Sequence, residues 1–274
     1  GNLKVEDLNF SQRNFDVFSK AYNRPYGLVL VTGPTGSGKS TTLYATLGDV
    51  AKPEINIITV EDPVEFRMRG INQVQVNNKA GMTFAAALRS ILRADPDVVL
   101  IGEIRDQETA NIAIEASLTG HLVLSTLHTN DAPSAVTRLT EMGVEPFLLS
   151  SSLAAVMAQR LARRLCKKCK RQDTATEAEL RTLGVPHMPD TPLPTIWRPV
   201  GCRECANTGY SGRVAIQQVM GVDSTMEDLI ARGATSIDID KAAKEQGMTT
   251  LRKDGWQKAL QGITSVEEVL RVTV

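Results

Sequence analysis

The sequence contains no long apolar run, few aromatic residues and no excess of charge. Of its 274 residues, 31 are basic, 31 are acidic and 4% are aromatic. No uncharged apolar run approaches the about 20 residues of a membrane-spanning helix, so the sequence predicts none. Balanced charge argues against binding a polyanion over the whole surface, and such a role would need a local basic patch. Because no basic segment followed by an apolar one opens the chain, we expect a cytoplasmic protein.

The rest of the composition is that of an ordinary globular protein. Hydrophobic residues make up 42% of the chain and charged residues 23%, both typical of soluble domains. The length allows one large domain or two modest ones. The chain begins with Gly1 rather than Met, so we expect it to be a fragment of a longer protein.

Cysteine is scarce, and its spacing is informative. The four cysteines form two C-x-x-C pairs, Cys166 with Cys169 and Cys202 with Cys205. In a reducing compartment such pairs favour a metal over disulfides. Four thiolates suffice for one closed tetrahedral Zn²⁺ site, which would be structural because it has no open position. A disulfide or a redox role is the alternative.

The most informative motif is the glycine-rich run at residues 33–40, which fits G-x-x-x-x-G-K-[ST]. A predicted buried strand precedes it and a predicted helix follows, the context that distinguishes a nucleotide site from a turn without a ligand. Backbone N–H groups and the helix N-terminus would bind phosphates. Lys39 is placed to reach the β- and γ-phosphates and the Ser40 hydroxyl to hold Mg²⁺. The predicted binding residues are Gly33, Pro34, Thr35, Gly36, Ser37, Gly38, Lys39, Ser40 and Thr41.

Strands and helices alternate through the first half of the sequence, which predicts an α/β fold with a mostly parallel sheet covered on both faces. After Pro146 we expect a long helix running toward Leu165, and from Asp223 on a helical tail. Buried strands are predicted at 28–32, 55–60, 74–76, 98–101 and 122–127, and helices at 41–51, 83–93 and 106–118.

Carboxylates follow two of these predicted strands. Asp62 and Glu65 come after strand 55–60, and Glu103 comes after strand 98–101. The carboxyl ends of strands in an open α/β sheet face the ligand crevice. Glu65 or Asp62 could therefore orient and deprotonate an attacking water. The alternative is a solvated acidic turn.

The strand ending at Glu103 departs from the common second motif of nucleotide hydrolases. Gly102 stands where an Asp would hold the Mg²⁺ shell. We expect Glu103 to do this through water, which leaves Glu65 as the preferred general base, although the two roles could be exchanged. Arg105 could pair with acids or reach a phosphate.

Two of the three histidines, His121 and His128, bracket the predicted strand 122–127. His121 could donate a hydrogen bond to the γ-phosphate. A lone histidine is more often structural, and this alternative stays open for His121 and is favoured for His128.

These motifs, in this order, resemble the ATPases of type II secretion and type IV pilus assembly. The resemblance covers essentially the whole chain, and its acidic and histidine segments are more specific than the phosphate loop. It implies a catalytic Glu65, a Mg²⁺-linked Glu103 and functional His121 and His128. It also implies ATP rather than GTP. The matching segments are 33–40, 58–65, 98–106 and 119–129, both cysteine pairs and the closing segment formed by 251–252 and 264–270.

The resemblance also implies architecture and partners. We expect a RecA-like nucleotide-binding domain over residues 1–162, a zinc-binding subdomain over 163–213 and a helical part over 214–274. Such proteins resemble hexameric motors that act on a platform protein at the inner membrane, so we expect a cytoplasmic protein held there through partners. An upstream domain is expected to supply catalytic arginines, without which hydrolysis would be slow. The tetracysteine element favours assembly or secretion over pilus retraction.

Residues 160–171 hold the only local basic run. A solvated or subunit-contact face is favoured, contact with acidic lipid comes next, and nucleic acid is last because interleaved aromatics are absent. Two other functions stay open: a RecA-type nucleic-acid motor, and a nucleotide-binding scaffold with little turnover. The sequence does not choose between pilus assembly and type II secretion.

Overall fold

The computed structural model of the protein describes residues 3–273. Their main sheet has seven strands, ordered β3-β2-β4-β5-β1-β6-β9. All its neighbouring strands are parallel except β6 and β9, which are antiparallel. The predicted α/β class is therefore confirmed. The strands are β1 (Gly27–Thr32), β2 (Ile57–Glu61), β3 (Asn72–Gln75), β4 (Val98–Ile101), β5 (Leu122–Leu127), β6 (Leu153–Leu165) and β9 (Tyr210–Gly221).

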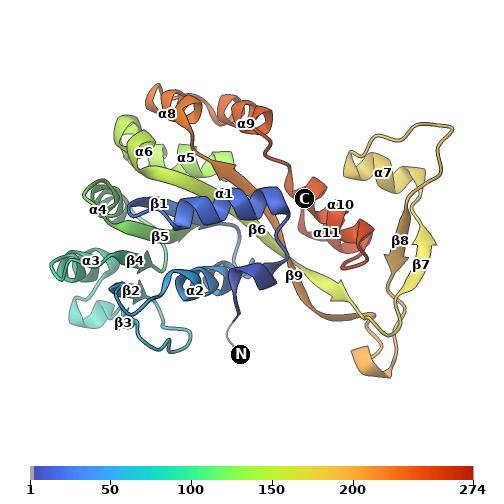
Figure 1. The fold of residues 1–274 in the computed structure, drawn as a ribbon, viewed down its shortest axis with the longest axis horizontal. Coiled ribbons are helices and arrows are strands. Elements are labelled where there is room, and N and C mark those ends of the chain that lie inside the picture. Colours follow the sequence, from blue (N-terminus) through green and yellow to red (C-terminus); the bar gives the residue numbers. More distant parts are fainter. Residues whose placement is uncertain (1–2, 274) are drawn as a thin grey trace.

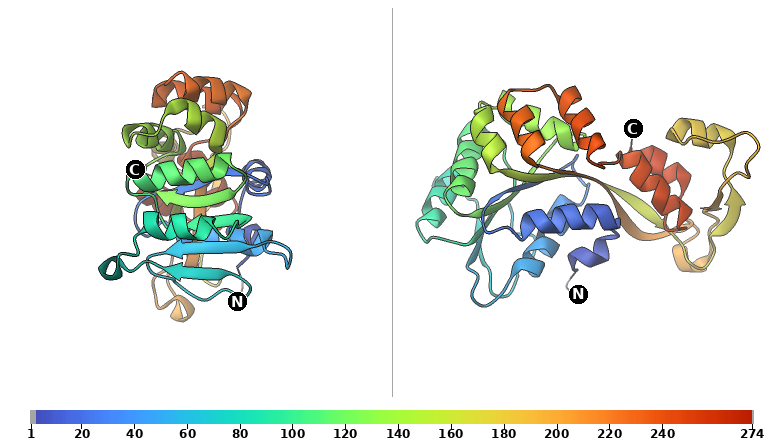
Figure 2. Two further views of the ribbon diagram at one scale, coloured as in Figure 1. Left: turned by 90° about the vertical axis from the view of Figure 1, so that its left-hand side faces the viewer. Right: turned by 45° about the horizontal axis from the view of Figure 1, so that its top comes forward.

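Helices cover both faces of this sheet (Figures 1 and 2). Because side chains alternate along a strand, Val29 and Val31 pack toward α1 and α2, whereas Leu28 and Leu30 pack in the core of the opposite face. One face carries η1 (Val5–Leu8), α1 (Gln12–Tyr22) and α2 (Lys39–Val50); the other carries α3 (Phe84–Leu92), α4 (Gln107–Leu118), α5 (Ala132–Glu141), α6 (Pro146–Ser152), α8 (Ser224–Ala231) and α9 (Ser236–Glu245). A short η2 (Asn78–Ala80) follows β3.

The long helix predicted from Pro146 to Leu165 is wrong. Helix α6 ends at Ser152, and the next residues form strand β6. This stretch is rich in Ala, Leu, Met, Gln and Arg, which are strong helix formers in isolation. β6 nevertheless lies between β1 and β9, with most of its residues buried, so tertiary pairing overrides the local preference.

β6 and β9 continue past the main sheet as a two-stranded ribbon into a second lobe (Figure 1). We call residues 166–209 the tetracysteine lobe. It holds β7 (Arg171–Thr174), α7 (Glu177–Leu183), β8 (Thr195–Arg198) and η3 (Arg203–Cys205). Helices α10 (Leu251–Leu260) and α11 (Val266–Val272) pack on the ribbon around a separate core that includes Ile196, Ile216 and Trp256.

The helical tail predicted from Asp223 on is confirmed, because α8, α9, α10 and α11 follow one another there. The expected domain boundaries at 162/163 and 213/214 fall inside β6 and β9, the two strands that lead from the main sheet to the tetracysteine lobe. Within the described residues, every helix is too short or too polar to cross a bilayer.

Candidate functional site

The phosphate loop connects the end of β1 to the start of α2. Gly38 is the residue before α2 and has a φ of 86°, a left-handed conformation that favours glycine. The first N–H groups of α2 lack intrahelical partners and give this end of the helix a partial positive charge. Within residues 3–273, the N–H groups of Gly36 and Gly38 donate no hydrogen bond. The buried Ser37 hydroxyl also has no hydrogen-bond partner among these residues. These polar groups fit an anion seated on the loop.

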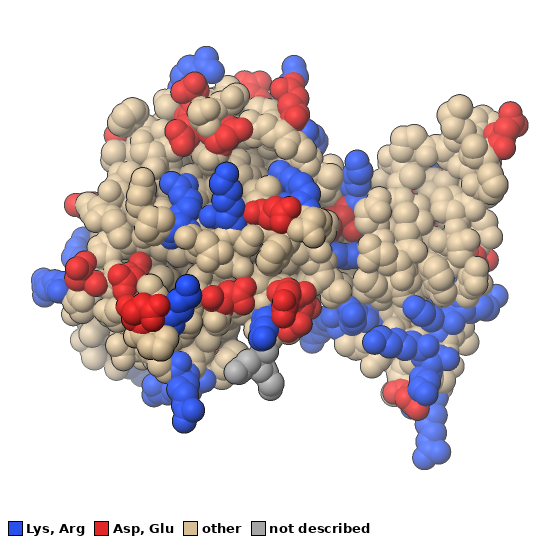
Figure 3. Space-filling model, in the orientation of Figure 1, with Lys and Arg blue, Asp and Glu red and all other residues tan. Residues whose placement is uncertain are grey.

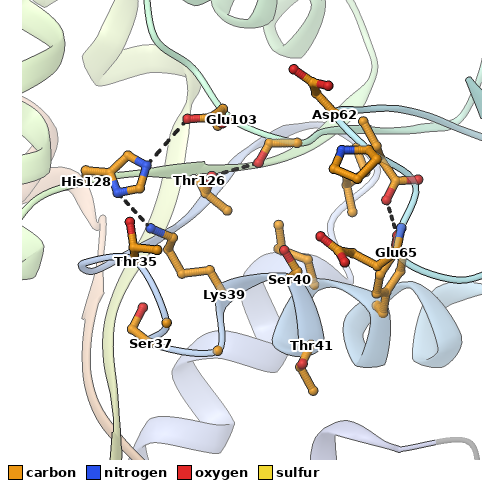
Figure 4. A pocket seen from close by; sticks show the side chains of 18 of the residues that line it. Thr35, Ser37, Lys39, Ser40, Thr41, Asp62, Glu65, Glu103, Thr126 and His128 are labelled. Carbon is orange, nitrogen blue, oxygen red and sulfur yellow. Dashed lines mark hydrogen bonds and ion pairs between the residues drawn. The ribbon is translucent and has the colours of Figure 1, made fainter. Parts of the chain in front are cut away.

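Acids from two strand ends and the loop surround one cavity of about 740 Å³ (Figure 4). This is the ligand crevice that the sheet topology predicts. Of the residues predicted for the nucleotide site, Gly33, Pro34 and His121 do not line the cavity. Those that do are Thr35, Gly36, Ser37, Gly38, Lys39, Ser40, Thr41, Asp62, Glu65, Glu103, Arg105 and His128.

A polar chain crosses the cavity from the loop to the end of β4. Lys39 Nζ donates to Gly33 O at 2.6 Å and lies 3.0 Å from His128 Nδ1. His128 Nε2 lies 3.4 Å from Glu103 Oε2, and Arg105 pairs with the other Glu103 oxygen. An ammonium can only donate, so Nδ1 of His128 accepts, and a neutral ring then carries its proton on Nε2 toward Glu103.

The same contacts move the pKa values of the charged groups. The hydrogen bond from Arg105 lowers the pKa of Glu103 despite partial burial, which keeps this carboxylate ionised at neutral pH. Burial lowers the pKa of Lys39, against the attraction of Glu103. The loop lysine is thus partly desolvated, the condition in which its charge interacts strongly with a phosphate.

Sequence reasoning missed Glu61 at the end of β2. Its side chain is buried and accepts hydrogen bonds from Tyr44, from Thr59 Oγ1 at 2.6 Å and from Gln73 Nε2 at 3.3 Å. Burial and the hydrogen bond to Glu61 raise the pKa of Tyr44 to about 12. The Tyr44 hydroxyl also accepts the N–H of Glu65 at 3.1 Å. Glu61 therefore anchors the turn that carries Glu65.

His121 lies at the opposite end of the sheet from the phosphate loop. It precedes β5 and its Nδ1 lies 2.6 Å from Pro96 O, whereas His128 follows β5. A six-residue strand separates its ends by about 20 Å. The hypothesis that His121 contacts the γ-phosphate in this cavity is therefore not supported by its position.

The four cysteine sulfurs come together in the tetracysteine lobe, all within 4.8 Å of one another. The Sγ atoms of Cys166 and Cys202, of Cys169 and Cys205, and of Cys202 and Cys205 are each 3.8 Å apart. Zn–S bonds of about 2.3 Å in a tetrahedron give S···S edges of about 3.8 Å. The donor set and its geometry therefore fit a structural zinc ion.

Backbone N–H groups also point at these sulfurs. Gly201 N lies 3.3 Å from Cys169 Sγ, and Cys202 N and Gly209 N each lie 3.2 Å from Cys205 Sγ. Burial acts to raise the pKa of Cys205, but these two N–H donors, together with hydrogen bonds from the Cys202 and Cys169 thiols, lower it to about 6. Such donors favour the thiolate that a metal requires.

The fold and the cavity define a P-loop nucleotide-binding protein with a RecA-like core. In the sheet, β5 stands between the loop strand β1 and the acid-bearing strand β4. Its Thr126 lines the cavity and donates to Gly102 O at 2.7 Å. This contact fixes the strand end that carries Glu103.

A family profile described as "Type II/IV secretion system protein" matches residues 1–271. The chain therefore belongs to this family. It is 51% identical over 271 residues to the type II secretion system protein E of Aeromonas hydrophila, covering 99% of this chain and 53% of that protein. It is 50% identical over 271 residues to the type IV pilus assembly ATPase PilB of Thermus thermophilus, covering 99% of this chain and 30% of that protein.

Solved structures share the fold. The pilus retraction motor PilT with bound ADP superimposes with a TM-score of 0.72 at 26% identity, covering 99% of this chain and 67% of that one. The ATPase DotB of Legionella pneumophila superimposes with a TM-score of 0.69 at 22% identity, covering 97% of this chain and 64% of that one. The chain spans about half or less of the two curated relatives described above.

Proposed function

We propose that this chain is the ATP-hydrolysing part of a motor that powers type II secretion or type IV pilus assembly. The observation that carries the proposal is the placement of Lys39, Glu65 and Glu103 around one cavity over the phosphate loop. The secretion and pilus context rests on the whole-chain likeness to protein E and PilB. The proposal that the nucleotide is ATP rests on the likeness to PilB, which is named an ATPase.

Each group has a proposed role in that cavity. Lys39 leaves His128 to bind the β- and γ-phosphates, and loop N–H groups hold the same oxygens. Glu65, exposed on the turn after β2, takes the proton of the attacking water. Ser40 and, through water, Glu103 would hold Mg²⁺, which when bound neutralises charge on the phosphates. Arg105 and His128 keep Glu103 ionised and oriented.

Replacing each candidate base by its amide tests these roles. We expect Glu65→Gln to lower turnover about 10²- to 10⁴-fold while leaving the Kd for ADP within threefold. Asp62→Asn, which alters the neighbouring exposed carboxylate on the same turn, is the matched control and should retain most activity. Loss of turnover in Asp62→Asn alone would assign the base to Asp62. If both variants hydrolysed ATP at the wild-type rate, neither Glu65 nor Asp62 would be the general base.

We also propose that the four cysteines hold one structural Zn²⁺ and that the motor serves assembly or secretion rather than retraction. The sulfur geometry supports the metal. Identity near 50% to protein E and PilB, against 26% to the PilT structure, supports the direction of action. The proposed units are the nucleotide-binding domain 1–162, the zinc subdomain 163–213 and the helical part 214–274.

The proposed assembly is a hexamer in the cytoplasm that acts on a platform protein at the inner membrane. Figure 3 shows basic side chains gathered on the lower side of the tetracysteine lobe. The exposed cations of the tetracysteine lobe include Lys167, Lys168, Arg171 and Arg203. Such a cluster suits the acidic headgroups beside a platform protein, each cation contributing about 1 kcal/mol near the surface.

Vesicle binding separates the proposed lipid contact from nucleic-acid binding. We expect cosedimentation with vesicles that contain an anionic lipid, weakened at least tenfold in K167E/K168E, and no stimulation of ATP hydrolysis by single-stranded DNA. Strong stimulation of ATP hydrolysis by DNA, with a steep dependence on salt, would contradict the secretion motor and favour a nucleic-acid motor.

A further inference from the structure

Gln159, on β6, lies against the phosphate loop. Its side chain is 1% exposed. The Nε2 atom donates to Ser37 O at 2.8 Å, and Oε1 accepts the Thr42 hydroxyl at 2.8 Å. One buried amide thus contacts both the loop and the first turn of α2. No motif in the sequence singles this residue out.

The loop glycines show how closely β6 approaches. A Cβ atom at Gly33 would lie 2.6 Å from Gln159 O, and one at Gly38 would lie 2.9 Å from Gln159 Nε2. Both distances are too short for a real side chain, so the loop backbone is seated directly on Gln159. The backbone of Gln159 is itself held by Arg160, whose Nη1 donates to Gln159 O at 2.8 Å.

The hydrogen bond to Ser37 O orients the next peptide group. In a trans peptide the C=O of one residue and the N–H of the next point in opposite directions, and among residues 3–273 the only cis bond is Asp62–Pro63. With Ser37 O turned to β6, the N–H of Gly38 is turned away from β6. That N–H has no partner among the described residues, and it is the type of group that binds phosphate.

We propose that Gln159 is a positioning residue for nucleotide binding: by holding Ser37 O, it directs the Gly38 N–H toward the phosphates. This inference rests on the proposed function, because it assumes that a nucleotide occupies the loop. It also explains why an amide, which can donate to one carbonyl and accept one hydroxyl, stands at this buried position of β6.

The chain offers a matched control at Gln217. This residue lies directly opposite Gln159 in the β6–β9 register and is 0% exposed. Its amide donates to Leu8 O at 3.2 Å and accepts from Lys258 Nζ at 3.3 Å, and neither of these hydrogen bonds involves the phosphate loop. The same substitution at both positions removes a buried amide of equal size, and only one of the two touches the loop.

The experiment compares Q159M with Q217M, measuring the Kd for Mg–ADP by calorimetry and the Tm without nucleotide. We expect Q159M to weaken ADP binding about tenfold, the effect of one lost hydrogen bond. Q217M should lower the Tm but change the Kd less than twofold. If Q159M does not fold, Q159E takes its place, because it keeps the acceptor for Thr42 and loses the donor to Ser37 O.

The outcomes separate the inference from the proposed function. A wild-type chain that does not bind ADP would refute the proposed nucleotide site itself. A wild-type chain that binds, with Q159M within twofold of it, would overturn the role of Gln159 alone. Equal weakening in Q159M and Q217M would also overturn it, since general destabilisation would then explain the effect.

Discussion

The imidazole of His128 lies 3.4 Å from the carboxylate of Glu103, Nε2 to Oε2. The other ring nitrogen lies 3.0 Å from Lys39 Nζ. One side chain from the end of β5 thus joins the acid after β4 to the lysine of the phosphate loop. In the proposed mechanism Lys39 turns to a phosphate and His128 remains to orient Glu103.

This relationship predicts a kinetic effect for His128. We expect His128→Ala to lower kcat about tenfold, the worth of one hydrogen bond to a charged group, because Glu103 then keeps only its contact with Arg105. The Kd for ADP should stay within threefold, since Lys39 and the loop are intact. Steady-state ATP hydrolysis and calorimetry measure the two quantities.

His121 supplies the control for that experiment. It lies at the other end of β5, bonded to Pro96 O, so His121→Ala should leave the Kd for ADP within twofold. If His128→Ala turned over ATP as fast as the wild type, His128 would have no role in hydrolysis.

The stability of the tetracysteine lobe should depend on the zinc proposed for its four cysteines. We expect one zinc per chain by elemental analysis, and a zinc content far below one in Cys205→Ser, because three thiolates no longer close the tetrahedron. The variant should also melt at a lower temperature. Lys167→Ala, an exposed change inside the same C-x-x-C segment, should keep its zinc. A wild-type chain purified without metal, yet equally stable after chelation, would contradict the structural role.

The sequence predicted the phosphate loop, the parallel sheet and the acids at its edge because each depends on local patterns. The loop motif at residues 33–40 joins its own strand to the start of its own helix, and Glu65 and Glu103 lie on the turns that follow β2 and β4. Parallel strands place all such ends at one edge. The cavity therefore follows from the order of elements alone.

What the sequence did not predict depends on long-range packing. β6 has the composition of a helix and becomes a strand only because β1 and β9 flank it. Gln159 and Glu61 are polar residues in buried strands, and their importance comes from partners as distant in sequence as Ser37 and Tyr44. His121 resembled a site residue because it adjoins a site strand, but it lies at the wrong end.

Glu268 should make the fold sensitive to acid. Its carboxylate accepts from the backbone N and the Nε of Arg163, at 2.7 and 3.0 Å, and from Arg271 Nε at 2.6 Å. Burial acts to raise its pKa, but the hydrogen bonds from Arg271 and Arg163 lower the pKa from 4.5 to about 2. A carboxyl group whose pKa is lower in the folded state than in the unfolded state stabilises the fold at pH values above its unfolded pKa. This contribution is present above about pH 4.5 and is lost as the pH falls toward 2.

We expect Glu268→Gln to lower the free energy of unfolding at pH 7 by about 1–2 kcal/mol, a value reduced by solvent screening of the two half-exposed arginines. The difference from the wild type should shrink between pH 4.5 and 2. Urea titrations at several pH values measure it. The neighbouring Glu267, half exposed in an ion pair with Arg198, gives the control, and Glu267→Gln should cost less than about 0.5 kcal/mol. A constant difference at all pH values would contradict the assignment.

The ion pair between Asp254 and Lys258 on α10 is buried, each side chain 4% exposed, with 2.8 Å between Oδ2 and Nζ. Removing one partner leaves a buried charge alone, so Lys258→Met should cost about 3–5 kcal/mol. Adding Asp254→Leu should recover part of that loss. Asp240→Asn breaks a pair with the same spacing on the surface of α9 and should cost less than about 0.5 kcal/mol. Additive losses in the double variant would contradict coupling across this pair.

A crystal structure with a non-hydrolysable ATP analogue and Mg²⁺ would show whether the loop binds nucleotide as proposed. We expect the triphosphate on residues 33–40, with Lys39 released from His128 and the carboxylates of Glu65 and Glu103 facing the γ-phosphate. A nucleotide bound elsewhere, or a loop that stays bare at saturating ligand, would contradict this expectation.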